Sequence, residues 1–337
     1  MIEGIQTTKQ ETLRVRSTND GIHLTGSILW FDSYVRGELS FLSSAASPAK
    51  SHVPQVIATE ETIKILEALR KRANALVCQY NRPFSIGRLK IELLPSGCIL
   101  GGASLYVETA KGRFLYAPSL QPNRIPTVRQ MQVKRASTLI TCAHHPDPNA
   151  TLPNRKKERE RLVQAVKAML SNGQYPVVFC QPIGTAQEIT HLFCENDIPL
   201  AVTSSIFRVN KIHEAYGVRL GNYAHYSKRT DRQRVVLLPF VDALSQPWRR
   251  KLPDGPVLYV EDDITTKRPE PAAFRPITER FYLSNACDGK ELREIISLVD
   301  PKELFIFGPY ARRYAEEFQG ICPKVHPLFP DDQPTLF

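Results

Sequence analysis

Strand-like and helix-like segments alternate along the chain from residue 154 onward, and this alternation restricts the possible folds more than any other feature. Arg155–Leu170 has apolar residues at helical spacing and ends at the stop signal Ser171-Asn172-Gly173. Because parallel strands are joined by helical crossovers, this pattern predicts a parallel α/β layer. The alternation continues with a strand at Pro176–Cys180, a helix at Gly184–Cys194, a strand at Pro199–Thr203 and a helix near Val209–Ala215.

The residues before 150 favour short strands separated by turns. One helix is expected among them, from Glu60 to about Val77, with Thr59 as its N-cap. Residues 244–278 are rich in Pro, Arg and Lys and are expected to be irregular. The expected strands are Gly21–Trp30, Leu39–Leu42, Arg88–Leu94, Ala103–Thr109 and Arg113–Tyr116, and the last part should contain a helix at Gly289–Leu298, a strand at Glu303–Phe307 and a helix at Ala311–Phe318.

A length of 337 residues suits two closely joined domains. Hydrophobic residues make up 42% of the chain and charged residues 23%, as in ordinary globular proteins. No apolar run approaches the roughly 20 residues that span a bilayer, and the N-terminus has no signal-peptide core. We therefore expect a cytoplasmic, nucleoid-associated protein with no membrane partner.

The net charge of +10 favours a polyanionic partner, since cationic side chains release counterions from nucleic acid. The alternative is an ordinary solvated surface. Seven scattered cysteines without a CxxC pair indicate reduced thiols. The candidate nucleic-acid ligands come from four basic clusters and are Arg155, Lys156, Lys228, Arg229, Arg249, Arg250, Lys267 and Arg268.

Four segments carry a resemblance to a known family: Phe31–Ala49, Pro95–Ala103 (PSGCILGGA), Phe114–Pro122 (FLYAPSLQP) and Phe281–Asp288 (FYLSNACD). In order and spacing they resemble the β-CASP branch of the metallo-β-lactamase fold. Within that branch they are most similar to bacterial DNA-ligase-associated exonucleases, also labelled mRNA 3′-end-processing-factor-like. The resemblance implies an αββα metallo-β-lactamase domain with an inserted β-CASP α/β domain.

The resemblance also implies domain limits. Residues 1–150 and 279–330 would form the two parts of the metallo-β-lactamase-like domain, residues 151–278 the β-CASP-like domain, and residues 331–337 a tail. In the glycine-rich segment, Gly97, Gly101 and Gly102 would allow close approach of backbones.

Family members bind two zinc ions that activate a water for phosphodiester attack. At the aligned ligand positions, this chain has side chains that are poor ligands or no ligands at all. The resemblance therefore implies a pseudo-nuclease without resident metal or catalytic residues. The degenerate positions are Ser44, Ala46, Pro48, Ala49, Cys98, Ser119, Cys142, Ala286 and Phe307.

In two alternative interpretations this site still binds a metal or carries out a reaction. Cys98 and Cys142, with nearby imidazoles, could hold a single zinc, although small buried cysteines that fill space fit the same pattern. Cys142 with His144 or His145 has the residue types of a thiol nucleophile and its base. The alternative function is thus an exonuclease or phosphodiesterase with a relocated metal or a cysteine-based site.

The final residues Gln333, Leu336 and Phe337 form a Gln-x-x-Leu-Phe sequence that resembles a sliding-clamp-binding peptide. Such peptides bury a leucine and an aromatic ring in a preformed pocket. The alternative is a tail packed on its own body. The expected function is a non-catalytic DNA replication or repair scaffold tethered to the sliding clamp. A catalytic β-CASP homologue or a repair helicase or ligase is a further expected partner.

Overall fold

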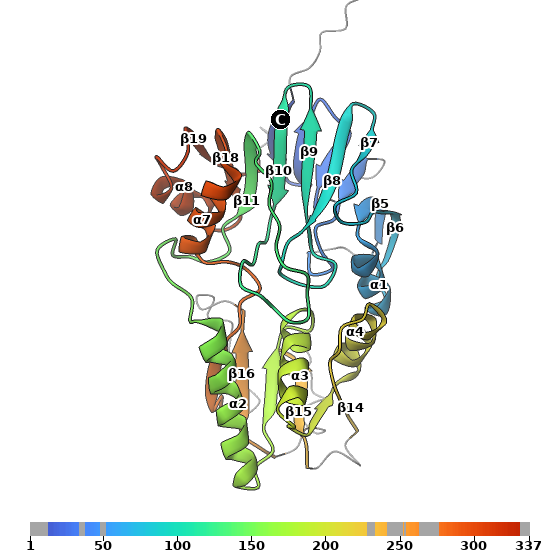
Figure 1. Ribbon diagram of the computed structural model, residues 1–337, viewed down its shortest axis with the longest axis vertical. Coiled ribbons are helices and arrows are strands. Elements are labelled where there is room, and N and C mark those ends of the chain that lie inside the picture. Colours follow the sequence, from blue (N-terminus) through green and yellow to red (C-terminus); the bar gives the residue numbers. More distant parts are fainter. Residues whose placement is uncertain are drawn as a thin grey trace, which may run out of the picture.

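The structure, a computed structural model, describes residues 13–33, 38–47, 52–227, 233–240, 252, 254–262 and 276–330. Figure 1 shows two bodies stacked along the long axis, an upper one built on two sheets and a lower one built on a third. Both ends of the described chain belong to the upper body, whereas the middle of the chain forms the lower body.

The first sheet, sheet A, has the strand order β1-β2-β3-β4-β5-β6. It begins as an antiparallel meander and continues with parallel pairs from β3 to β6. Its strands are β1 (Arg14–Thr18), β2 (Gly21–Thr25), β3 (Leu29–Phe31), β4 (Leu39–Phe41), β5 (His52–Ala58) and β6 (Arg72–Val77).

The second sheet, sheet B, has the order β19-β18-β11-β10-β9-β8-β7 and combines the first half of the chain with its last part. Helices α7 (Gly289–Val299) and α8 (Ala311–Glu317) accompany its late strands. The strands are β7 (Phe84–Ile86), β8 (Leu89–Pro95), β9 (Ala103–Thr109), β10 (Gly112–Ala117), β11 (Thr138–Cys142), β18 (Glu303–Phe307) and β19 (Lys324–Pro327).

The upper body has four layers. Apolar side chains such as Phe31 and Phe41 of sheet A and Leu105 of sheet B form one core between the sheets. Helices α7 and α8 bury Ile295 and Tyr314 against the outer face of sheet B. Helix α1 (Glu60–Ala68) packs on the outer face of sheet A. The order is helix, sheet, sheet, helix.

The lower body is the parallel α/β layer that the alternation predicts. Its sheet, sheet C, has the order β14-β13-β15-β12-β16-β17, and every pair is parallel. Helices α2 (Arg155–Ser171), α3 (Thr185–Glu195) and α4 (Ser204–Ala215) cover one face through a shared core. The strands are β12 (Val177–Cys180), β13 (Leu200–Val202), β14 (Ala224–His225), β15 (Val235–Pro239), β16 (Val257–Glu261) and β17 (Glu279–Tyr282).

Two expectations about secondary structure need correction. The helix starts at its Thr59 cap, which accepts from the Thr62 amide at 3.2 Å, but ends at Ala68. The residues Arg72–Val77 form a strand instead, because pairing with β5 outweighs their local helical pattern. Within the stretch expected to be irregular, β16 is a buried strand.

The domain limit also moves. β17 pairs with β16 in sheet C, so Glu279–Tyr282 belongs to the lower body rather than to the final part of the upper one. Among the described helices, none combines the length and apolar character needed to cross a bilayer.

Candidate functional site

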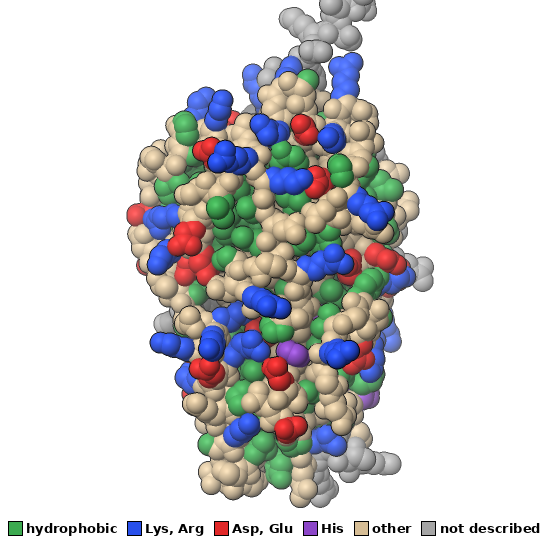
Figure 2. All heavy atoms as spheres, in the orientation of Figure 1, with side chains coloured by type: hydrophobic (Ala, Val, Ile, Leu, Met, Phe, Trp, Pro, Cys, Tyr) green, Lys and Arg blue, Asp and Glu red, His purple; other side chains and the backbone are tan. Residues whose placement is uncertain are grey.

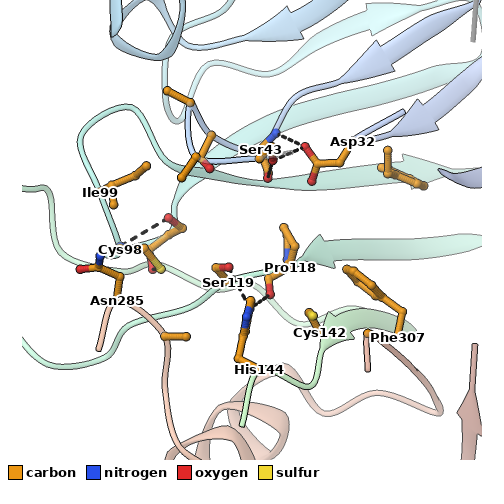
Figure 3. Close-up of a pocket in the computed structure, with 18 of the residues that line it drawn as sticks. Asp32, Ser43, Cys98, Ile99, Pro118, Ser119, Cys142, His144, Asn285 and Phe307 are labelled. Atoms are coloured by element: carbon orange, nitrogen blue, oxygen red, sulfur yellow. Dashed lines mark hydrogen bonds between the residues drawn. The ribbon is translucent and has the colours of Figure 1, made fainter. Parts of the chain in front are cut away.

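A cavity of about 950 Å³ lies where the loops of the three sheets meet. Sheet A contributes Asp32 and residues 43–47, and sheet B contributes the loops after β8, β10, β11 and β18. On the side of sheet C, the cavity is lined by Gln181–Ile183 in the turn after β12. Figure 3 shows side chains from these separate segments directed toward one space.

The described positions that the family resemblance singled out all line this one cavity. The segments that carry them lie far apart in the sequence, from the loop after β4 to the end of β18. Pro48 and Ala49 lie outside the described residues. The lining positions are Ser44, Ala46, Cys98, Ser119, Cys142, Ala286 and Phe307.

The turn that carries Cys98 depends on glycines. Gly97 and Gly101 have positive φ values of 79° and 78°. A Cβ on Gly97 would lie 2.3 Å from the Gln121 carbonyl oxygen, and one on Gly101 would lie 2.5 Å from the Thr62 amide nitrogen. Only glycine fits such contacts, so the expected close approach of backbones is confirmed at both positions.

Asp32 is the acidic group that organises the sheet A side of the cavity, and it was not among the sequence-based candidates. Its Oδ1 accepts from the Ser43 amide at 2.8 Å and the Ser47 hydroxyl at 2.9 Å, and its Oδ2 accepts from the Tyr116 hydroxyl at 2.8 Å. Burial raises the pKa of Asp32, although these three hydrogen bonds oppose the rise. The residue holds a loop in place.

Phe307 belongs to an aromatic cluster. Its ring lies parallel to that of Tyr116, with centroids 5.9 Å apart, and Tyr116 stacks on Phe31 at 4.5 Å. Phe41 meets Tyr116 edge-on at 6.1 Å. A stacked phenyl ring therefore fills a position that the family resemblance aligns with a histidine.

Ser119 and His144 form a hydroxyl–imidazole pair that does not amount to a nucleophile and its base. His144 Nε2 lies 2.9 Å from Ser119 Oγ and 2.7 Å from the Pro118 carbonyl oxygen (Figure 3). A carbonyl oxygen only accepts, so Nε2 must carry the proton that it donates there. That nitrogen then has no lone pair with which to deprotonate Ser119.

The cavity thiols are held in their neutral form. Burial raises the pKa of Cys98 and of Cys142 to about 12, and the charge of Asp32 adds to the effect at Cys142. Cys98 instead donates to the Ser96 carbonyl oxygen at 3.6 Å. Because the thiolate is the nucleophile, this environment opposes a cysteine-based reaction.

The donor set does not fit the two zinc ions bound by members of the family that the sequence resembles. Methyl, phenyl, hydroxyl and thiol groups stand at the aligned positions. Within the described ranges, no group of three or more His, Cys, Asp or Glu side chains is arranged to hold a metal ion. Cys98 and Cys142 thus have no third ligand of these types there.

Arg155 has a structural partner. Its guanidinium makes a two-pronged contact with Glu188, with Nε to Oε1 at 3.0 Å, and also donates to the Ser284 carbonyl oxygen. The side chain is 10% exposed and that of Glu188 is fully buried. Binding a phosphate there would break this pair, so we leave Arg155 out of any nucleic-acid surface. Lys156 is exposed at the start of α2.

The remaining candidates lie outside the described part of the chain. They are the basic residues Lys228, Arg229, Arg249, Arg250, Lys267 and Arg268 and the tail residues Gln333, Leu336 and Phe337.

Comparisons with known proteins give a distant relative in sequence and solved structures with a similar fold. No family model matches the chain. It is 20% identical over 324 residues to a protein of Opitutus terrae named "Probable DNA ligase". That alignment covers 94% of this chain and 31% of the relative, so the chain spans about a third of the relative's length.

A crystal structure of a protein of unknown function from Enterococcus faecalis V583 matches with a TM-score of 0.59 at 16% identity. It covers 87% of this chain and 79% of the other. Similarity at this level shows a shared mixed α/β fold.

Proposed function

We propose that the chain is a pseudo-nuclease of the β-CASP metallo-β-lactamase type that acts as a DNA-associated scaffold in replication or repair. The observation that carries this proposal is the cavity itself. Seven positions aligned with family metal ligands converge on it, and they present methyl, phenyl, hydroxyl and thiol groups. The cavity is then a former reaction centre that retains its shape but no longer has the side chains that bind metal.

The arrangement of layers supports the fold assignment. The helix–sheet–sheet–helix order of the upper body and the parallel sheet inserted between β11 and β18 match what the family resemblance implies. Residues 1–150 and 283–330 would then form the metallo-β-lactamase-like domain and residues 151–282 the β-CASP-like domain.

The DNA assignment is supported by the relative named as a DNA ligase and by the net charge of +10. Because the chain matches only a part of that relative, a ligase is a reasonable functional partner. A repair helicase or a catalytic β-CASP homologue is another, and the clamp-like tail would tether the protein to the sliding clamp.

The decisive experiment combines DNA binding with a search for turnover. Purified protein is mixed with labelled single- and double-stranded DNA, with Mn²⁺ or Zn²⁺ added, and its metal content is measured. We expect salt-dependent binding, intact DNA and no stoichiometric metal. Metal-dependent degradation that is abolished in a His144→Ala variant would instead establish an exonuclease with a rebuilt site in this cavity.

The tail is tested separately by binding to the sliding clamp. A variant with Gln333→Ala, Leu336→Ala and Phe337→Ala should lose binding, whereas Thr335→Ala between the anchor residues should keep it. Equal clamp binding by the triple variant and the unmodified protein would remove the tether from the proposal.

A further inference from the structure

Much of the excess positive charge comes from residues 109–146, which lie outside the four basic clusters of the sequence. Residues 109–146 contain no Asp or Glu and have six basic side chains. This stretch alone supplies six of the ten net positive charges. The six are spread along the stretch and are Lys111, Arg113, Arg124, Arg129, Lys134 and Arg135.

Residues 122–136, which we call the basic strap, connect β10 to β11 without helix or strand and cross the outer face of sheet B. The Gln132 amide donates to the Pro95 carbonyl at 2.9 Å at the end of β8. The Ala136 amide donates to the Val299 carbonyl at 3.1 Å at the end of α7. The strap is therefore fixed at both sides of the sheet.

Side chains of the strap divide by character. Ile125 is buried, and Met131 and Val133 pack into the core beneath the strap. Four cationic residues of the strap are exposed instead: Arg124, Arg129, Lys134 and Arg135. Anchoring by the apolar residues thus presents the cations on an ordered backbone, which reduces the entropy cost when a ligand binds.

Neighbouring strands add to this surface. Ser137 Oγ donates to the Arg113 carbonyl at 2.8 Å, which holds Arg113 of β10 beside the end of the strap. Two acidic side chains of the sheet are paired on this side, Glu92 with Lys134 at 2.7 Å and Glu108 with Lys90 at 3.6 Å, and Glu291 of α7 accepts a hydrogen bond from Asn123 of the strap. Figure 2 shows Lys and Arg outnumbering Asp and Glu on the upper face, which is sheet B in this orientation.

We propose that the outer face of sheet B, with the basic strap, binds the sugar-phosphate backbone of DNA. This proposal rests on the proposed DNA association and gives it a location outside the cavity. Guanidinium groups suit phosphate oxygens because their planar fork donates two parallel hydrogen bonds. Backbone contacts of this kind carry no base information, so binding should be independent of sequence.

The test measures the salt dependence of duplex binding by fluorescence anisotropy. The strap variant carries Arg124→Gln, Arg129→Gln and Arg135→Gln, and leaves Lys134 in place because Glu92 needs it. A matched control removes three exposed charges from α2 with Lys156→Gln, Lys157→Gln and Lys167→Gln. Unchanged thermal unfolding of both variants excludes a folding defect.

We expect the strap variant to bind DNA more weakly, with a salt slope smaller by about 0.9 for each phosphate that the protein no longer neutralises. The control should keep the original slope. If the unmodified protein binds DNA and only the control binds more weakly, the strap assignment is wrong while the DNA association stands. If the unmodified protein does not bind DNA, the proposed function itself fails. Tighter binding to polyglutamate than to duplex would assign the strap to an acidic protein and overturn the DNA assignment.

Discussion

The Tyr116 hydroxyl donates a hydrogen bond of 2.8 Å to Asp32 Oδ2, and this contact joins sheet B to sheet A beside the cavity. Asp32 also accepts from the Ser43 amide and the Ser47 hydroxyl. One carboxylate thus fixes the loop that the family resemblance aligns with the main metal-binding loop.

Removal of this carboxylate should destabilise the fold. Asp32→Ala leaves the Ser43 amide and the Tyr116 hydroxyl without their acceptor, so the free energy of unfolding should fall by about 2–4 kcal/mol. Asp32→Asn keeps an acceptor and should stay within about 1 kcal/mol of the original protein. Urea unfolding measures both values, and equal stability of the alanine variant would show that the loop needs no anchor.

The stability of the original protein and that of the Asp32→Asn variant should depend differently on pH. Because the pKa of Asp32 is raised in the folded state, the folded protein binds this proton more tightly than the unfolded chain. Its contribution to stability is present below the usual aspartate pKa and is lost as pH rises through the raised value. The stability of Asp32→Asn relative to the original protein should therefore increase over that range, as measured by urea unfolding at each pH.

Arg155 should act in folding rather than in DNA binding. Arg155→Met removes both short hydrogen bonds to the buried Glu188 carboxylate and leaves it only the longer Arg159 contact, Nε to Oε1 at 3.8 Å, which should cost about 2–3 kcal/mol of unfolding free energy. Lys156→Gln, one residue along the same helix, is exposed and should change stability by less than about 0.5 kcal/mol. A stable Arg155→Met protein that binds DNA weakly would reverse this assignment.

His213 should make the protein sensitive to acid. Its ring is fully buried, Nδ1 lies 3.0 Å from the Val209 carbonyl oxygen, and burial lowers its pKa to about 4. As the pH falls, the unfolded chain protonates His213 before the folded protein does. The contribution of neutral His213 to the unfolding free energy is therefore fully present above a pH of about 6.5 and decreases as the pH drops toward about 4. The loss from this group is about 3 kcal/mol at most.

A His213→Gln variant removes the titration and serves as the comparison. Its unfolding free energy should fall less steeply over the same pH range than that of the original protein. Parallel curves for the two proteins would show that another group causes the acid sensitivity.

The cavity thiols should resist alkylation. With a pKa of about 12, the thiolate fraction of Cys98 or Cys142 at pH 8 is on the order of one in ten thousand. Iodoacetamide should therefore label neither residue in the folded protein and both after unfolding, as read by mass spectrometry of peptides. Rapid labelling of folded Cys142 would revive the cysteine-based alternative.

The local sequence pattern was sufficient to predict those helices and strands whose own side chains determine their conformation. The apolar spacing of Arg155–Ser171 and the alternation around Glu303–Phe307 predicted both elements almost to the residue. The glycines at 97 and 101 could be read as points of close approach, because only glycine tolerates that geometry. A resemblance spread over four segments named positions that do meet in one cavity.

Long-range contacts decided the rest. Arg72–Val77 became a strand because β5 offered it hydrogen bonds that its own sequence does not encode. Asp32 gained its role from Tyr116, which is far away in the sequence, and Arg155 pairs with Glu188 on another helix. The four cations of the basic strap lie over sheet B only because apolar neighbours fix the strap there. Periodicity records which side of an element faces the core, whereas partners in space depend on how the whole chain packs.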